Sequence, residues 1–135
     1  MAPASFVPLS APRRRLAVLL ATAPGERFQP LPPASDPPSH TLFADDFACV
    51  ASALRSAVAA GDDAALFLMD HGVLYATDPR LPPLLAEGID VALCATDAEA
   101  QGLDLMAAAS HGILLGSQHD HARLVRDSDR FLSFT

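Results

Sequence analysis

The sequence predicts an α/β domain in which helices cover both faces of a mainly parallel sheet. The chain has 135 residues, a length that suits one compact domain built around a single core. Half of the residues are hydrophobic, and after Pro38 short apolar runs alternate with stretches of helical periodicity. This alternation is typical of strands joined by right-handed helical crossovers, which leave the strands parallel to one another.

The charge balance excludes several classes of protein. All nine basic residues are arginine, and 16 acidic residues bring the net charge to −7. The only dense basic run is at residues 13–15, so the sequence does not predict the basic face that direct nucleic-acid binding needs. Two cysteines are too few for a disulfide scaffold, and no run approaches the ~20 apolar residues of a membrane span. We therefore expect a cytoplasmic protein that contacts neither nucleic acid nor a membrane.

The first apolar run, residues 16–23, is predicted to be a buried strand that ends at Pro24. It also resembles a short signal peptide, but a proline directly after the small residues of a cleavage site disfavours processing. Residues 1–14 are predicted to be a flexible leader and residues 15–135 a single domain. A proline-rich loop at about residues 23–40 cannot be helical, and its length is that of a lid, an interface arm or a mobile insertion.

A helix is predicted after this loop, because apolar residues recur at offsets of 4, 3, 4 and 4 along one stripe. Thr41 is its predicted N-cap and Gly61 its predicted end. Residues 64–69 form a short apolar run that predicts the second strand. The stripe consists of Phe43, Phe47, Val50, Leu54 and Val58.

The next helix is predicted to start with Asp78 as its cap and Pro79 just inside it, and to end near Gly88. Residues 89–94 predict the third strand. A helical stretch then opens at Thr96 and Asp97. It is interrupted at Gly102 and resumes through residues 105 and 106, and the remaining elements are a strand over 112–116, a short helix over 119–126 and a last strand over 130–134.

Polar and reactive side chains gather where the predicted strands end. In a parallel sheet the carboxyl ends of the strands meet at one edge, and binding sites form there. Three of the five histidines and one of the two cysteines fall at this edge. The candidates are Thr22, Pro24, Asp70, His71, Gly72, Cys94, Thr96, Asp97, Ser117, Gln118, His119, Asp120 and His121.

Cys94 is the candidate catalytic residue, because it lies where a strand passes into a helix. A thiol at a helix N-terminus is exposed to the positive end of the helix dipole, which favours the reactive thiolate. Asp97 and Asp120 would oppose this effect, whereas a protonated histidine would assist it. A buried, inert cysteine is the alternative. Cys49 lies on the first predicted helix, where we expect a packing role, and a disulfide between the two cysteines is disfavoured in the cytoplasm.

The histidines of this edge permit a metal site made of His71, His119 and His121, but their spacing gives it little support, and we expect no metal and no cofactor. Residues two apart do not share a helix face, so the His119–His121 pair could bind one ion only if the segment were a loop. No serine occupies a nucleophile elbow, and no glycine-rich phosphate loop is present in the sequence. Polar histidines that orient other groups are the simpler interpretation.

The chain resembles the DsrE/DsrF-like family, which contains small sulfur-relay subunits. The resemblance covers about residues 15–135 and rests on the order and spacing of four pieces, among which the strand-end cysteine is the most specific. These pieces are LLATAP at residues 19–24, LFLMDHGV at 66–73, VALC at 91–94 and DRFLSF at 129–134.

The resemblance implies a three-layer α/β/α sandwich with a five-stranded sheet, assembled into trimers or hexamers or with related subunits. In the relay members the cysteine that matches Cys94 accepts sulfane sulfur as a persulfide from a donor protein and passes it to an acceptor protein. The other residues would support this site or bind a ligand: Asp70, His71, Thr96, Asp97, Gln118, His119 and His121.

Three functions therefore stay open. The first is a sulfur carrier or sulfurtransferase-like protein, for which the sequence does not decide whether the chain is an enzyme. The second is a non-catalytic module that binds a small ligand or a metal at the strand ends. The third is a subunit that serves assembly, in which side chains would fill the pocket at the strand ends.

Overall fold

Five parallel strands form the centre of the molecule in the order β4-β3-β2-β1-β5. The structure is a computed structural model that describes residues 13–25 and 45–135. Most of the predicted leader and of the proline-rich loop lies outside these residues. The elements are β1 (Arg15–Leu20), α1 (Phe47–Ala59), β2 (Asp63–Leu68), the 3₁₀ helix η2 (Asp70–Thr77), α2 (Leu81–Ala86), β3 (Asp90–Cys94), α3 (Ala95–Ala100), α4 (Leu105–Ser110), β4 (Leu114–Gly116), α5 (Gln118–Asp127) and β5 (Arg130–Phe134).

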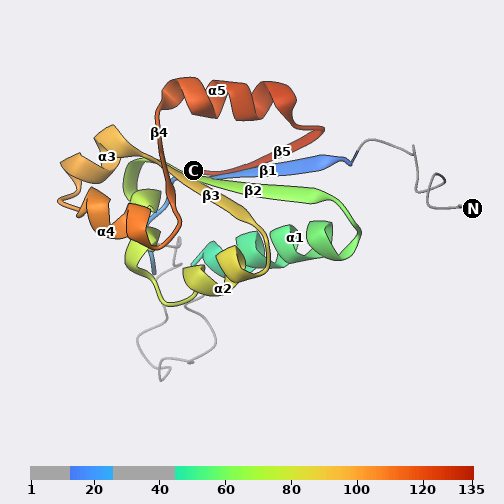
Figure 1. The fold of residues 1–135 in the computed structure, drawn as a ribbon, viewed down its shortest axis with the longest axis horizontal. Coiled ribbons are helices and arrows are strands. Elements are labelled where there is room, and N and C mark those ends of the chain that lie inside the picture. The colour runs from blue at the N-terminus through green and yellow to red at the C-terminus, as the bar shows by residue number, and fades with distance from the viewer. Residues whose placement is uncertain (1–12, 26–44) are drawn as a thin grey trace, which may run out of the picture.

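Helices cover both faces of the sheet, as the sequence predicts (Figure 1). Helices α1 and α2 lie on one face and α5 lies on the other, while α3 and α4 lie towards the carboxyl ends of the strands. The strand order explains this arrangement. The chain steps from β1 to β4 in one direction, which puts the crossovers on one face, and then returns across the sheet to β5, which puts α5 on the opposite face.

The main core lies between the sheet and helices α1 and α2. Side chains alternate between the two faces of a strand, so Val18, Leu66 and Leu93 all point to this face and are at most 1% exposed. Leu54 of α1 and Leu84 of α2 are fully buried against them. Burying each such leucine contributes about 2 kcal/mol to the free energy of folding. Packing on this face of the sheet therefore stabilises the fold more than packing on the opposite face.

The opposite face is covered much more thinly. Its buried apolar cluster consists of Leu19, Phe67 and Cys94, and Leu124 of α5 and Phe131 of β5 pack against it. Helix α5 itself has no fully buried residue. Large apolar side chains remain exposed near the β4 edge of this face, with Leu114 62% exposed. The second layer is therefore one helix resting on a small apolar cluster.

All five predicted strands and the parallel sheet are confirmed, with strand ends that differ from the prediction by at most three residues. The predicted start of α1 is wrong: the helix begins at Phe47 with Asp46 at its N-cap, and Thr41 and Phe43 lie outside the described residues. The predicted cap Asp78 is also displaced. It precedes α2 by a turn, accepts a hydrogen bond from the Arg80 backbone N–H at 2.9 Å, and leaves the N-cap position to Arg80.

The helix η2 was not predicted, because its residues carry no helical stripe. Its path is set by a close backbone approach: a Cβ atom on Gly72 would lie 1.9 Å from the carbonyl oxygen of Leu20. Only a residue without a side chain fits between η2 and the end of β1. Asp70, the first residue of η2, has a φ of 51°, which few non-glycine residues adopt.

Candidate functional site at the carboxyl edge of the sheet

The carboxyl ends of β2 and β3 are tied together by a side chain of the predicted site. Asp97, in the first turn of α3, accepts a hydrogen bond from the Asp70 backbone N–H at 2.7 Å. This bond joins the turn after β2 to the helix after β3 and helps to hold Asp70 in its left-handed conformation. Asp97 therefore fixes the turn after β2 relative to α3, the helix that directly follows Cys94.

Cys94 is the last residue of β3 and the N-cap residue of α3. Its side chain belongs to the α5 face of the sheet, where it is 3% exposed within the cluster of Leu19 and Phe67. Met69, at the end of β2, and Leu124 of α5 pack against the same cluster. The thiol is thus at the predicted edge but is shielded by apolar side chains.

His121 is the one histidine of the candidate site that packs into this layer. Its ring lies 5.4 Å from that of Phe67 and 5.9 Å from that of Phe131, measured between ring centroids. Its Nε2 atom is buried and has no hydrogen-bond partner among the described residues. A buried polar atom without a partner is uncommon and calls for an explanation.

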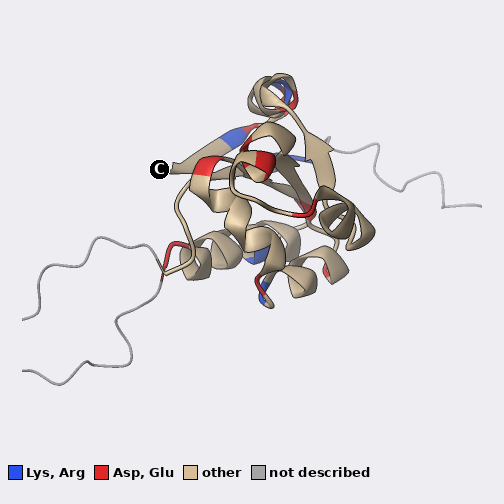
Figure 2. Cartoon of the chain, turned by 90° about the vertical axis from the view of Figure 1, so that its left-hand side faces the viewer, with Lys and Arg blue, Asp and Glu red and all other residues tan. Residues whose placement is uncertain are grey.

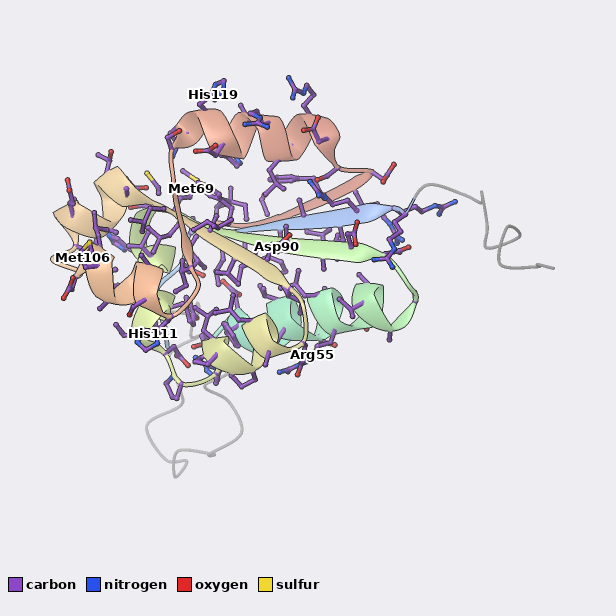
Figure 3. All side chains as sticks on the ribbon, in the orientation of Figure 1. Arg55, Met69, Asp90, Met106, His111 and His119 are labelled. Atoms are coloured by element: carbon purple, nitrogen blue, oxygen red, sulfur yellow. The ribbon has the colours of Figure 1, made fainter. Side chains whose placement is uncertain are left out.

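The other predicted residues of α5 face solvent. Gln118 and His119 are exposed, and Figure 3 shows His119 on the outer side of the helix. Asp120 caps the helix, because its Oδ2 atom accepts hydrogen bonds from the backbone N–H and the hydroxyl of Ser117, at 2.8 and 3.1 Å. The backbone hydrogen bond is the main reason why the pKa of Asp120 is lowered.

His71 and Thr96 are exposed. The Nε2 atom of His71 lies 3.9 Å from Oδ1 of Asp70, both on the rim of the edge. Within residues 13–25 and 45–135, no group of three or more His, Cys, Asp or Glu side chains could hold a metal ion. The structure therefore does not bring His71, His119 and His121 together as a set of ligands.

The charge around the edge is acidic. Asp70, Asp97 and Asp120 all follow the ends of strands, and Figure 2 looks onto this side of the molecule. The candidate thiol therefore lies at an edge whose charged side chains are carboxylates.

The packing role expected for Cys49 is wrong, because this residue is exposed on α1. Its position lies outside the buried face of α1, which consists of Phe47, Val50, Ala51, Leu54 and Ala57. Neither cysteine forms a disulfide.

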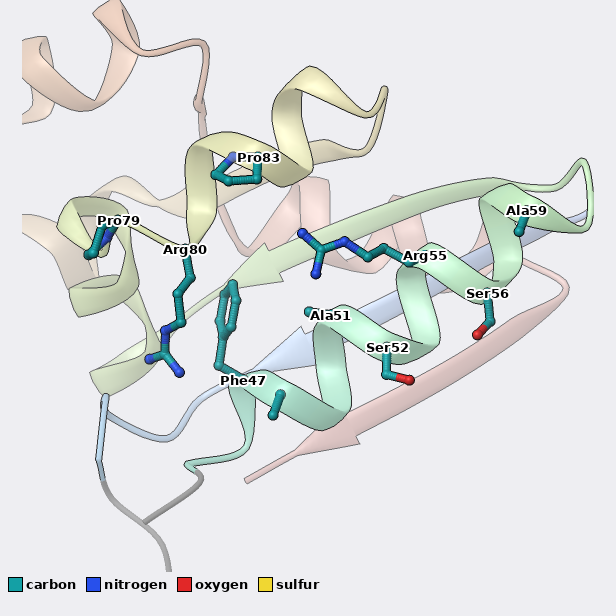
Figure 4. A pocket seen from close by; sticks show the side chains of 10 residues that line it. Phe47, Ala51, Ser52, Arg55, Ser56, Ala59, Pro79, Arg80 and Pro83 are labelled. Atoms are coloured by element: carbon teal, nitrogen blue, oxygen red, sulfur yellow. The ribbon is translucent and has the colours of Figure 1, made fainter. Parts of the chain in front are cut away.

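A second polar cluster, which the sequence does not predict, lies at the base of α1 (Figure 4). The guanidinium of Arg80 donates two hydrogen bonds to the 4% exposed carboxylate of Asp45, at 2.9 and 2.7 Å. It lies 4.6 Å from the centroid of the Phe47 ring and also pairs with Asp78 at 2.8 Å. No sequence spacing could have paired residues 45 and 80, because tertiary contacts alone bring them together.

The cluster holds Asp45 as an anion. Burial raises the pKa of its carboxyl, but the hydrogen bonds from Arg80, from the Gly25 backbone N–H and from Tyr75 outweigh this effect and lower the pKa to about 2. Phe47 and Arg80 also line an open groove of about 860 Å³ between α1 and α2. Because both acidic partners of Arg80 are already in place, we assign the cluster a structural role.

Comparison with known proteins supports the fold alone. No family model matches the sequence, and none of the curated proteins matches it. Among solved structures, the chain is similar to the YchN protein from E. coli, with a TM-score of 0.59 and 22% identity over 90% of this chain and 99% of that one. It is also similar to BT1422, a conserved protein of unknown function from Bacteroides thetaiotaomicron, with a TM-score of 0.59 and 18% identity over 89% and 94% of the two chains.

Proposed function

We propose that this chain is a DsrE-like carrier of sulfane sulfur, with Cys94 as the residue that holds the sulfur as a persulfide. The observation that carries the proposal is the position of Cys94, at the junction of β3 and α3 and inside a shielding apolar cluster. The fold, which the chain shares with YchN from E. coli, and the resemblance of its sequence to the DsrE/DsrF-like family support the same assignment. Sulfur donor and acceptor proteins would be its partners.

The proposed step is a simple exchange. The Cys94 thiolate attacks the outer sulfur of a donor persulfide, a new S–S bond forms, and the donor leaves as a thiolate, so that no external oxidant or reductant is needed. The cluster around Cys94 then separates the persulfide from thiols in solution until an acceptor reaches it.

The experiment is mass spectrometry of the chain after incubation with a low-molecular-weight persulfide. Because Cys49 is exposed and can take up sulfur unspecifically, Cys49→Ser serves as the background. We expect mass additions in steps of one sulfur atom that a reductant removes. The double variant with Cys94→Ser should show none, and uptake by that variant would refute the assignment.

A subunit that serves assembly is the second candidate, favoured by two observations. The strand-end thiol is covered by side chains rather than lining a pocket, and Leu114 and Val125 are exposed on the thinly covered face, by 62% and 42%. Apolar surface of this kind is typical of interfaces between subunits. An oligomer by light scattering, combined with no sulfur uptake by the Cys49→Ser chain, would favour this candidate over the carrier.

A ligand-binding module has less support. The described residues offer no set of metal ligands.

No helix within residues 13–25 and 45–135 is long and apolar enough to cross a membrane.

A further inference from the structure

We propose that α5 is an acid-sensitive cover over Cys94 and that protonation of His121 loosens it. The first observation is the weak attachment of α5. This helix has no fully buried residue, and its contacts with the sheet are made through His121 and Leu124. The inference deepens the proposed function, because it concerns access to the same thiol, and it rests on that function for its biological meaning.

The second observation is the environment of His121. Its ring packs between Phe67 of β2 and Phe131 of β5, and its buried Nε2 atom has no partner within the described part of the chain. A neutral imidazole fits here at the cost of one unsatisfied nitrogen. An imidazolium carries two N–H donors and a full charge, and burying such a donor without a partner costs considerably more.

The acidic groups of the edge offset only part of this cost. Asp70 and Asp120 are exposed, so their attraction for a buried cation is weakened by solvent, and Asp97 already accepts a hydrogen bond from the Asp70 backbone N–H. The acidic residues on this face of the sheet are Asp63 and Asp90, the first residues of β2 and β3, at the opposite end of the strands from Cys94. On α5, Asp120 accepts hydrogen bonds from the neutral Ser117 and remains an exposed anion, whereas Asp127 pairs with Arg126.

Two arginines and one cysteine are the other titratable groups near His121. Arg123 of α5 and Arg15 of β1 lie along the groove beside the helix, and their positive charge disfavours another cation. Cys94 is the titratable group of the shared cluster. Attraction between an imidazolium and the two phenylalanine rings returns only part of the desolvation cost.

Protonation therefore favours a state in which His121 reaches water. Because Leu124 lies one turn further along the same helix, moving His121 outward also withdraws Leu124 from the cluster of Cys94. Histidine is the side chain that gains its charge between pH 5 and 8. The thiol should therefore become more accessible as the pH falls.

The test measures alkylation of both cysteines of the native chain with iodoacetamide, by peptide mass spectrometry at pH 5.5 and pH 8. The exposed Cys49 is an internal reference for the pH dependence of the reagent. The ratio of Cys94 to Cys49 labelling should rise as the pH falls, by up to about tenfold per pH unit, the limit for uptake of one proton. A ratio that stays constant or falls would overturn the proposal.

Two variants separate His121 from other titrating groups. His121→Phe keeps an aromatic ring but cannot be protonated, so its labelling ratio should be independent of pH. His119→Phe alters the exposed histidine of the same helix and should keep the wild-type dependence. If His121→Phe retains that dependence, His121 is not the responsible group and the proposal is wrong.

Hydrogen exchange keeps the test decisive should a variant fold poorly. In the wild-type chain, the amides of α5, corrected for intrinsic exchange, should lose protection at pH 5.5 relative to those of α1. Equal protection of α5 at both pH values would contradict the proposal. None of these measurements uses a sulfur donor, so a chain whose α5 opens but takes up no sulfur would refute the proposed function alone.

Discussion

Single residues fix the backbone around the candidate site. Gly72 lets η2 pass close to the end of β1. The hydrogen bond from Asp70 to Asp97 joins η2 to α3, the helix that follows Cys94. Cys94 itself is predictable from the sequence, because a strand-end cysteine before a helix is visible in the chain. Its 3% exposure is not, because burial depends on Met69 and Leu124, which come from other elements.

Replacement of Gly72 by alanine should destabilise the chain strongly. The new Cβ atom would meet the Leu20 carbonyl carbon at 2.6 Å and its oxygen at 1.9 Å, and a backbone group cannot rotate away as a side chain can. We expect a loss of about 3 kcal/mol in the free energy of unfolding, measured by urea denaturation. Gly102→Ala is the control, because nothing lies within 4 Å of its Cβ atom and only its φ of 78° is unfavourable. A smaller loss at Gly72 than at Gly102 would contradict the close approach.

Elements differ in how far the sequence predicts them. Apolar runs predict β1, β2 and β3 most clearly, because these strands are buried on both faces and are apolar along most of their length. The helix α5 is predicted as a short helix over residues 119–126, yet its place as the cover of the second face follows from the return of the chain from β4 to β5. The start of α1 was misplaced, because Thr41 and Phe43 continue the helical pattern beyond the residue at which the helix begins.

The capping residue Asp120 should control how firmly α5 begins. Asp120→Ala removes the two hydrogen bonds with Ser117, and loss of such a cap costs about 1 kcal/mol of helix stability. Exchange of the α5 amides should therefore become roughly fivefold faster, measured by hydrogen exchange. Asp127→Ala, at the other end of the helix, removes an exposed pair with Arg126 and should change little. Equal effects of the two variants would argue against the cap.

At the scale of the whole molecule, the cluster of Asp45 and Arg80 joins segments that are distant in sequence. It links Gly25 after β1, the start of α1 and the turn before α2. Its carboxylate is buried, so its contribution depends on remaining charged. The function of the edge depends on the same arrangement, because these segments set the positions of the strands that carry the site.

Stability should fall at acidic pH through Asp45. The pKa of its carboxyl is lowered to about 2 in the folded chain, whereas an unfolded aspartate has a pKa of about 3.9. The stabilisation is therefore fully present above about pH 4 and is lost as the pH falls towards 2. Asp45→Asn should lose about 3 kcal/mol at pH 7 and show a weaker dependence on pH in this window, measured by thermal denaturation.

The matched control is Asp63→Asn, which breaks an exposed pair with Arg13, 3.3 Å long. Exposed pairs contribute less than about 1 kcal/mol, so this variant should resemble the wild type at both pH values. An Asp45→Asn variant as stable at pH 7 as the Asp63→Asn variant would show that the buried pair contributes little.

The sequence by itself determined the five strands, their parallel arrangement and the edge at which Cys94 lies, because apolar runs and turn residues are local signals of strand and helix. The tertiary structure alone decided what surrounds that cysteine. It buried the thiol beneath α5, placed His121 between two phenylalanine rings, left Cys49 in solvent and paired Asp45 with Arg80. Each of these facts depends on contacts between residues far apart in the chain, which no local pattern encodes.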